Sequence, residues 1–275
     1  MKPLDIAFIG GGNMASALAA GLIGKHCEAS QVHVVDINED TVQGWLEKGC
    51  TGSTAPDDTL SGRRVWILSV KPQFLKQAID QCRPYLDEQT LVISVAAGIS
   101  GHTLSQWLGT TQDPWTRLIR CMPNTPALVG AGATGMMGLG GVTPDDRTLA
   151  DDLMGSIGQI AWVQDDDAID AVTALSGSGP AYVFLFLESL IQGAVQLGLS
   201  EEQARTLALA TVGGAVTLAQ NSPDPLATLR EKVTSKGGTT AAALNAFNEQ
   251  DFAQVVSNAM QAAYTRAGEL SKELS

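Results

Sequence analysis

Positive charge is scarce in this sequence of 275 residues. Lysine and arginine number 17 against 29 aspartate and glutamate residues, so the formal net charge is −12 at pH 7. An acidic chain is a poor non-specific partner for nucleic acid or an anionic membrane, and we expect neither. The charge does not exclude an anionic small-molecule substrate, because local backbone N–H groups can outweigh a distant field.

Cysteine is also sparse, and its residues are scattered. Cys27, Cys50, Cys82 and Cys121 form no CxxC pair and have no histidine nearby at metal-ligand spacing. This pattern is typical of reduced, buried thiols in a cytosolic protein, and it predicts no metal site.

Segments for targeting or membrane insertion are lacking as well. The N-terminus runs straight into a strand-like stretch, without the basic start and apolar core of a signal peptide. Residues 181–199 come closest to a membrane span, but Glu188 and Gln192 interrupt them. The sequence therefore predicts a cytoplasmic protein with no membrane span.

A glycine-rich turn stands near the start of the chain. The apolar strand candidate at residues 4–9 runs into G-G-G-N-M-A at residues 10–15, and a helical pattern follows. This G-x-G-x-x-A run suits a dinucleotide: Gly10 makes the tight turn, Gly12 admits a pyrophosphate, and Ala15 lets helix and strand pack closely. The alternative is a tight turn that binds no ligand.

Further strand candidates alternate with helical segments through the first half. They lie at residues 32–35, 65–70, 91–95, 118–121, 134–139 and 160–163. This alternation predicts a parallel, doubly wound sheet of the Rossmann type. Ligands of such sheets lie beyond the carboxyl ends of the strands, so we expect Lys71, Ala97 and Asn124 to face a cofactor cleft.

The second strand candidate ends in Asp36. A carboxylate at this place can accept hydrogen bonds from a ribose 2′-hydroxyl and would repel a 2′-phosphate. No arginine follows closely, so this residue favours NADH over NADPH. The alternative is a solvated aspartate at a strand end.

The second half is predicted to be all α-helical, with the domain boundary between residues 163 and 164. The acidic run at residues 164–167 is interpreted as a solvated linker and helix start. An apolar helix over 182–197 is expected to be buried, Ser200 to cap the next helix, and an amphipathic helix to cover 252–270. Helices so apolar are hard to cover within one subunit, which predicts an oligomer built through this half.

Two glycine-rich segments of the second half could contact ligands. L-S-G-S-G-P-A-Y at residues 175–182 is predicted to be a close-approach loop that either lines the cleft or lets two helices cross. V-T-S-K-G-G-T-T at residues 233–240 leads into an alanine-rich helix. Its bare backbone N–H groups predict an anion site for a phosphate or a carboxylate, with an ordinary helix cap as the alternative.

Five motifs in this order resemble the pyrroline-5-carboxylate reductase family over nearly the whole chain: G-G-G-N-M-A, S-V-K-P, M-P-N-T-P-A, L-S-G-S-G-P-A-Y and V-T-S-K-G-G-T-T. The resemblance implies reduction of 1-pyrroline-5-carboxylate to L-proline by NADPH or NADH, the last step of proline biosynthesis. It also implies a Rossmann domain followed by an all-α dimerisation domain. That domain interlocks two subunits of a homodimer, and dimers of the family often form larger rings, commonly decamers.

The resemblance assigns roles to positions of this sequence. Implied cofactor-binding residues are Gly10, Gly12, Asn13, Met14, Ala15, Ser69, Val70, Lys71, Pro72, Ala96, Ala97 and Gly98, and Asp36 joins them from its place at the strand end. Implied substrate-binding residues are Ser235, Gly237, Gly238, Thr239 and Thr240, with Thr240 as the catalytic residue. Two positions depart from the family: Lys236 stands where many members have proline, and Asp36 argues for NADH where members more often favour NADPH.

Two other functions are alternatives to this one. Hydroxyacid dehydrogenases of similar layout place a lysine shortly after a glycine-rich helix start, and residues 182–197 contain none. A dinucleotide-binding sensor without catalysis would have no reason to keep the hydroxyl-rich helix start. His26, His33 and His102 are interpreted as surface histidines rather than catalytic bases, since none joins a constellation of partners.

Overall fold

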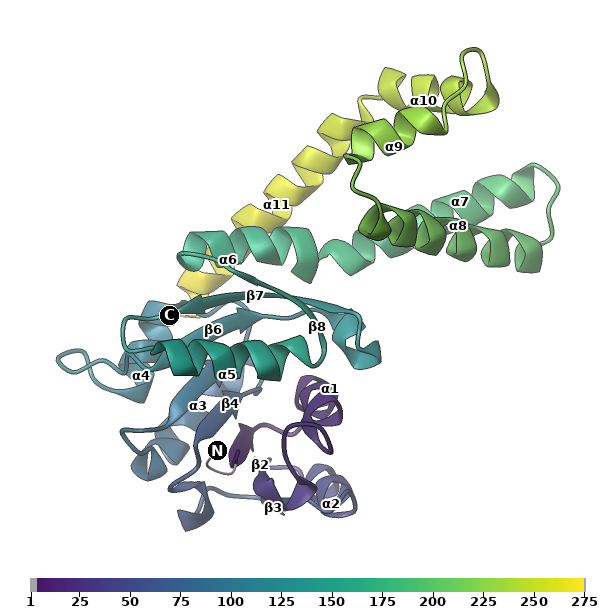
Figure 1. Cartoon of the computed structure of the whole chain (residues 1–275). Coiled ribbons are helices and arrows are strands. Elements are labelled where there is room, and N and C mark those ends of the chain that lie inside the picture. The colour runs from purple at the N-terminus through teal and green to yellow at the C-terminus, as the bar shows by residue number, and fades with distance from the viewer. Residues whose placement is uncertain (1–3, 275) are drawn as a thin grey trace. The chain divides into compact units, whose positions relative to one another are not determined.

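The computed structural model describes residues 4–274, which form two compact units (Figure 1). The first unit runs up to Ser178 and takes in the chain again from Ala263, and the second unit spans Gly179–Ala262.

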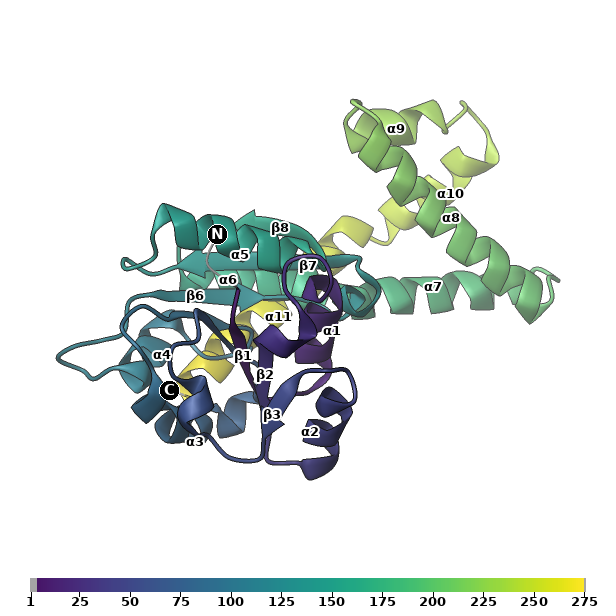
Figure 2. The ribbon, with the colours of Figure 1, turned by 60° about the horizontal axis from the view of Figure 1, so that its bottom comes forward.

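The first unit is built on an eight-stranded sheet with the order β3-β2-β1-β4-β5-β6-β7-β8. The strands are β1 (Ile6–Ile9), β2 (Val32–Val35), β3 (Thr51–Ser53), β4 (Val65–Leu68), β5 (Leu91–Ser94), β6 (Leu118–Met122), β7 (Gly132–Gly138) and β8 (Gly158–Trp162). The first six have the strand order of dinucleotide-binding Rossmann sheets, so the predicted fold class is confirmed. Figure 2 shows β1, β2 and β3 side by side at one end of the sheet.

The prediction of a fully parallel sheet was wrong at one place. β6 and β7 pair antiparallel, whereas the other neighbouring pairs are parallel. Only residues 123–131 connect these two strands, and they contain a short 3-10 turn, Thr125–Val129. A parallel crossover needs a dozen residues or more, so a connection of this length returns the chain antiparallel. The short strand β3 was not predicted, because its residues T-G-S carry no apolar pattern.

The central strands β1, β2, β4 and β5 bury both of their faces, whereas the edge strands β3 and β8 contain no buried residue. Ile6 and Phe8 of β1 pack with α1 (Asn13–Leu22), α2 (Glu39–Leu46) and α5 (Pro144–Gly155). The alternate residues Ala7 and Ile9 pack with α3 (Pro72–Cys82) and α4 (Gly101–Leu108) on the other face. Burial on both faces explains why these strands are continuous apolar runs rather than alternating ones.

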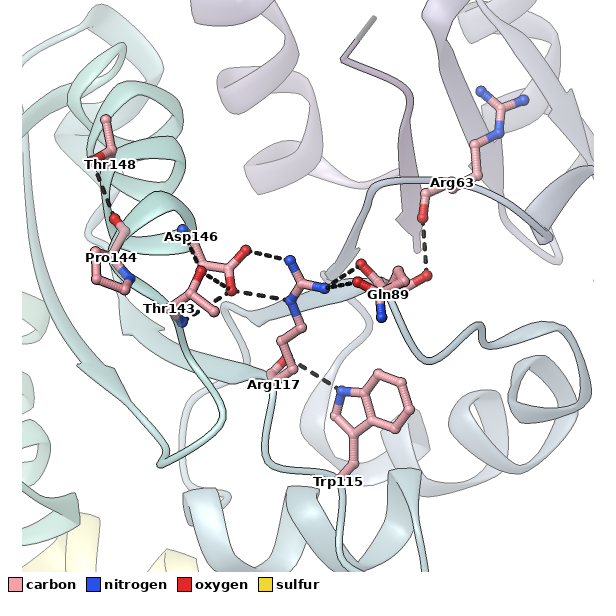
Figure 3. A network of polar contacts seen from close by, with 9 residues as sticks. Arg63, Gln89, Trp115, Arg117, Thr143, Pro144, Asp146 and Thr148 are labelled. Atoms are coloured by element: carbon pink, nitrogen blue, oxygen red, sulfur yellow. Dashed lines mark hydrogen bonds and ion pairs between the residues drawn. The ribbon is translucent and has the colours of Figure 1, made fainter. Parts of the chain in front are cut away.

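Arg117, directly before β6, links the sheet to the start of a helix (Figure 3). The guanidinium of Arg117 donates to both carboxylate oxygens of Asp146 at 2.7 and 3.0 Å, and also to the backbone oxygen of Gln89 at 2.7 Å. Asp146 completes the capping box of α5 with Thr143, which confirms the helix start predicted there. Burial raises the pKa of Asp146, but the hydrogen bonds from Arg117 and Thr143 outweigh it and hold that pKa below its usual range.

The acidic run at residues 164–167 starts a helix, but it is not merely a solvated linker. Asp165 caps α6 (Asp166–Val172) as predicted. Asp166, however, accepts hydrogen bonds from the Gly101 N–H at 2.9 Å and from the guanidinium of Arg120, which is 1% exposed on β6. Burial raises the pKa of the neighbouring Asp170, and Arg120 offsets only part of that effect. These carboxylates are structural partners of a buried arginine.

The predicted helices of the second half are present: α7 (Gly179–Gln196), α8 (Glu201–Asn221), α9 (Leu226–Lys232), α10 (Thr239–Glu249) and α11 (Phe252–Glu273). Ser200 caps α8 in a capping box with Gln203. The predicted loop at residues 175–182 was wrong, because Thr173–Gly177 forms a π-helical turn after α6. The hydroxyls of Thr173 and Ser176 donate to backbone carbonyls one turn earlier, which satisfies them without a loop.

The expected burial of the apolar helix is not met within one chain. No residue of α7 is buried, and Phe184 and Leu185 are 59% and 64% exposed. Within the second unit as described, the buried apolar residues are Ala204 and Ala208 of α8. A surface this apolar requires a partner.

The sequence predicted no segment that is long and apolar enough to span a membrane. By length and composition alone, this prediction was also wrong. Among the described residues one helix, Asp166–Gln196, has a mean hydropathy of 1.3 over its most apolar window, and 11% of that window is buried. Glu188 does not interrupt the helix, because one charge is tolerated in a segment of this length.

His33 is not a surface residue as predicted, since it is 2% exposed on β2. Its Nδ1 lies 2.9 Å from the Thr51 hydroxyl, and its Nε2 lies 2.9 Å from the Thr59 hydroxyl. Burial, and then the charge of Arg63, lower the pKa of His33 below its usual value. The ring therefore stays neutral near pH 7 and links β2 to its neighbours.

We expect His33 to weaken the fold in acid. Above about pH 6.5 the ring is neutral in both the folded and the unfolded chain, but below that pH only the unfolded chain takes up the proton. The free energy of unfolding should therefore fall more steeply between about pH 6.5 and pH 5 in the parent than in His33→Asn. Urea unfolding at several pH values measures this, with the exposed His102→Asn as the control. Equal slopes in the parent and His33→Asn would contradict the expectation.

Candidate dinucleotide and substrate sites

A pocket of about 870 Å³ opens at the carboxyl ends of β1, β2 and β4 in the first unit. It is lined by Ile9, Gly12, Val35, Asp36, Ile37, Thr41, Thr54, Ala55, Pro56, Ser69, Val70, Lys71, Phe74, Gln77, Ala78, Gln81 and Cys82. This is the switch point of the strand order, where doubly wound sheets bind their ligands.

Five of the predicted cofactor residues line this pocket: Gly12, Asp36, Ser69, Val70 and Lys71. The remaining ones lie outside its lining. Gly10 forms the turn after β1, Asn13, Met14 and Ala15 open α1, and Pro72 opens α3. Ala96, Ala97 and Gly98 follow β5, and a side chain at Gly98 would lie 3.4 Å from Leu270 and Leu274 of the first unit.

The conformations of Gly10 and Gly12 agree with the tight turn predicted at the first and the space for a pyrophosphate predicted at the second. Gly10 has φ +95°, and a Cβ there would lie 2.9 Å from the backbone of Ser69. Gly12 is the N-cap of α1 without a side-chain cap, and a Cβ there would meet none of the described residues within 4 Å. An uncapped helix start with this open space can accept an anion such as a pyrophosphate.

The middle glycine of the predicted pyrophosphate loop is tightly packed, which was not predicted from the sequence. Gly11 is buried, and a Cβ there would lie 2.8 Å from the indole nitrogen of Trp45. Its N–H donates to Asp36 Oδ2 at 2.8 Å, and its carbonyl accepts from Trp45 Nε1 at 3.0 Å. The run of three glycines was the available signal, since the motif itself requires only the first and third.

Asp36 joins β2 to this loop. One carboxylate oxygen accepts from Gly11, and the other accepts from the Asn38 N–H at 2.9 Å. A carboxylate has about four lone-pair positions, so each oxygen keeps capacity for a further donor. Asp36 can therefore hold the loop and still accept hydrogen bonds from a ribose in the pocket.

Asn124 was expected to face the cofactor cleft, but it does not line the pocket, and its side-chain amide is used in the structure itself. It is 9% exposed, its Nδ2 donates to the Ser176 carbonyl at 3.0 Å, and its Oδ1 accepts from the Ala133 N–H at 2.9 Å. The side chain thus connects the π-helical turn with β7.

Cys82, at the pocket wall, is no nucleophile, because burial raises the pKa of its thiol to about 12.

The predicted anion site lies at the start of α10 in the second unit. Gly238 is its N-cap without a side-chain cap, and Thr239 and Thr240 form the first turn. Gly237 has φ +73°, which glycine adopts without strain. The Gly238 N–H donates to the Ser235 carbonyl at 3.0 Å, so the predicted residues are gathered in one turn.

The sheet order, the pocket at the switch point and the glycine loop define the chain as a dinucleotide-binding protein of the Rossmann class. A family model described as pyrroline-5-carboxylate reductase dimerisation matches residues 166–270. The pyrroline-5-carboxylate reductase of Pasteurella multocida is 39% identical over 277 residues, which cover 99% of each chain. The chain belongs to the pyrroline-5-carboxylate reductase family.

Further comparisons agree with both halves of the fold. A family model described as NADP oxidoreductase, coenzyme F420-dependent, matches residues 5–98. A pyrroline-5-carboxylate reductase structure from Coxiella burnetii has a TM-score of 0.90 and 36% identity, covering 98% of this chain and 99% of that one. The Plasmodium falciparum pyrroline carboxylate reductase with NADP bound has a TM-score of 0.84 and 29% identity, with the same coverage.

The family makes this chain an oxidoreductase that uses a nicotinamide cofactor and associates with itself through its helical half. Self-association also accounts for the exposed apolar side chains of α7. The match to a dimerisation region begins at the first residue of the membrane-length helix.

The Gly11–Trp45 contact gives a stability test. Gly11→Ala should lower the free energy of unfolding by about 1 to 3 kcal/mol, because the added methyl overlaps a buried indole and cannot be accommodated without a backbone shift. Gly12→Ala places the same methyl in open space and is the matched control. Denaturant unfolding of both variants measures the difference in the free energy of unfolding. Equal values would show that the loop backbone shifts at no cost to accommodate the methyl group.

Proposed function

We propose that this protein reduces 1-pyrroline-5-carboxylate to L-proline with NADH or NADPH, as the last step of proline biosynthesis. The observation that carries the proposal is the uncapped, hydroxyl-rich start of α10 in a chain that also has a dinucleotide pocket. Family membership supplies the substrate class, and the two sites supply a place for each reactant.

The start of α10 would bind the substrate through its carboxylate. The first backbone N–H groups of a helix have no partner within the helix, and the helix dipole favours an anion there. Ser235 adds a hydroxyl, and Gly237 leaves open space for a ligand beside the backbone, whereas a Cβ at Gly238 would lie 3.2 Å from the Ser235 carbonyl oxygen. Lys236, exposed in the same turn, adds positive charge where many members of the family have proline.

Thr240 would be the catalytic residue, with its hydroxyl hydrogen-bonded to the ring nitrogen of the imine. The cofactor, when bound, would supply a hydride for the imine carbon, and a proton carried by the substrate or taken from water would go to the ring nitrogen. Thr240 and the helix start hold that carbon in one orientation, so that the reaction depends on positioning more than on a strong acid.

The pocket of the first unit fits a dinucleotide and favours NADH within this proposal. Gly12 leaves room for the pyrophosphate at the start of α1. Asp36 lines the pocket, where it would accept from the ribose hydroxyls and repel a 2′-phosphate. Lys71 is the cationic residue among the described lining residues, so it would offset part of that repulsion.

The assembly belongs to the proposal as well. Residues 1–163 would form the cofactor domain, and residues 164–275 the dimerisation and substrate domain. Two subunits would interlock through the exposed apolar faces of α7 and α8, and dimers could join further into a decamer. A cytoplasmic location is supported by four free cysteines, all of them buried thiols.

Removing the Thr240 hydroxyl tests the catalytic assignment. In Thr240→Ala, kcat with pyrroline-5-carboxylate should fall about a hundredfold, because an oriented hydrogen bond to the reacting group is lost. The dissociation constant for NADH should stay unchanged. Thr234→Ala is the matched control, since that hydroxyl donates to the Arg230 carbonyl within the same segment. Full turnover by Thr240→Ala at saturating cofactor would refute the assignment of Thr240 as the catalytic residue.

Parallel oxidation of NADH and NADPH tests the cofactor assignment. The parent should show a higher kcat/KM with NADH, and Asp36→Ser should raise the NADPH to NADH ratio of kcat/KM about tenfold or more by removing the carboxylate. Glu39→Gln removes a nearby exposed carboxylate outside the pocket lining and should leave the ratio unchanged. An unchanged ratio in Asp36→Ser would exclude Asp36 as the determinant, and no turnover with either cofactor would refute the reductase.

A further inference from the structure

The glycine-rich loop is fixed by side chains from three different elements. The Gly11 N–H donates to Asp36 at 2.8 Å. The Gly10 carbonyl, on the opposite side of the same peptide group, accepts from the Ser69 hydroxyl at 2.7 Å. A trans peptide group points its N–H and C=O in opposite directions, so these two bonds together set the plane between Gly10 and Gly11.

The next peptide plane is set by Trp45. The Gly11 carbonyl accepts from the indole Nε1 at 3.0 Å, in a buried contact. The same trans geometry then points the Gly12 N–H away from the indole. Gly12 is exposed and lines the pocket, and its N–H has no hydrogen-bond partner among the described residues. The indole thus orients a free donor toward the open side of the loop.

Trp45 is itself held rigidly. It is 2% exposed, and its ring stacks on Phe8 of β1 with a centroid distance of 5.7 Å. The Lys48 ammonium lies 4.9 Å from the centroid of the ring. A donor fixed in this way keeps one position, whereas a glycine backbone without it can adopt many conformations.

We propose that Trp45 is a positioning residue for the cofactor: its indole N–H holds the loop in the conformation that presents the Gly12 N–H to the pyrophosphate. This inference rests on the proposed use of the loop by the dinucleotide. It requires the effect of Trp45 to fall on cofactor binding and to leave the chemical step unchanged.

The test is Trp45→Phe in the full-length protein, which keeps an aromatic ring against Phe8 and removes the N–H. The KM for NADH and the dissociation constant for ADP-ribose should both rise about tenfold, while kcat at saturating NADH stays within about twofold of the parent. AMP, which lacks the pyrophosphate, should bind as it does to the parent. Calorimetry and steady-state kinetics measure these values.

Trp66→Phe is the matched control. Trp66 is 1% exposed, and its indole donates to the Leu60 carbonyl, so the variant loses an equally buried bond elsewhere in the unit. It should bind ADP-ribose as the parent does. Replacing Trp45 with benzothienylalanine removes the N–H without changing the ring shape, and it serves as the second variant if Trp45→Phe folds poorly.

The outcomes separate this inference from the proposed function. Parent-like ADP-ribose binding by both Trp45 variants would overturn it, as would an equal loss in Trp66→Phe or an equal loss of AMP binding. Gly12→Glu, which fills the space for the pyrophosphate, tests the site itself. Loss of ADP-ribose binding in Gly12→Glu, with none in the Trp45 variants, would overturn only the inference. Parent-like binding by Gly12→Glu would refute the cofactor site as well.

Discussion

The pocket of the first unit depends on the conformation of three consecutive glycines. A glycine backbone loses more conformational freedom on folding than any other, so the loop needs specific partners to keep one shape. Asp36 at the end of β2, Ser69 after β4 and Trp45 of α2 each supply one hydrogen bond. The free energy of ordering the loop is thus spent when the protein folds, and a ligand that binds there need not order it again.

The second unit obeys a different constraint, because it has almost no apolar core within one chain. The apolar side chains of α7 remain exposed, and small alanines supply the buried apolar residues described in this unit. Apolar area yields roughly 25 cal/mol per Å² only when it is removed from water. The apolar side chains of this half therefore add to stability only when self-association covers them, and the family's dimerisation region provides such self-association.

Much of this arrangement could be predicted because it depends on residues close together in sequence. Strand ends, helix caps and the outer glycines are local patterns, and the structure places Gly12, Asp36 and Lys71 in one pocket. The contact between Gly11 and Trp45 spans 34 positions and leaves no periodic signal. The same holds for His33, whose hydroxyl partners come from β3 and from the 3-10 turn Asp58–Leu60. The strand β7 was predicted, but its antiparallel direction was not, because strand direction depends on the length of the connection rather than on the composition of the strand.

Several titratable side chains of the first unit are unsuited to act as an acid, a base or a nucleophile, which limits the mechanism that can be proposed. Burial keeps the Cys82 thiol and the His33 ring neutral near pH 7, so neither offers charge to a reaction. Arg120 is paired inside the first unit with Asp166 and Asp170. On the proposed function, the substrate then meets backbone N–H groups and threonine hydroxyls, which do not titrate near neutral pH. A site of this kind can orient an imine, but the proton that makes its carbon more electrophilic must come with the substrate or from water.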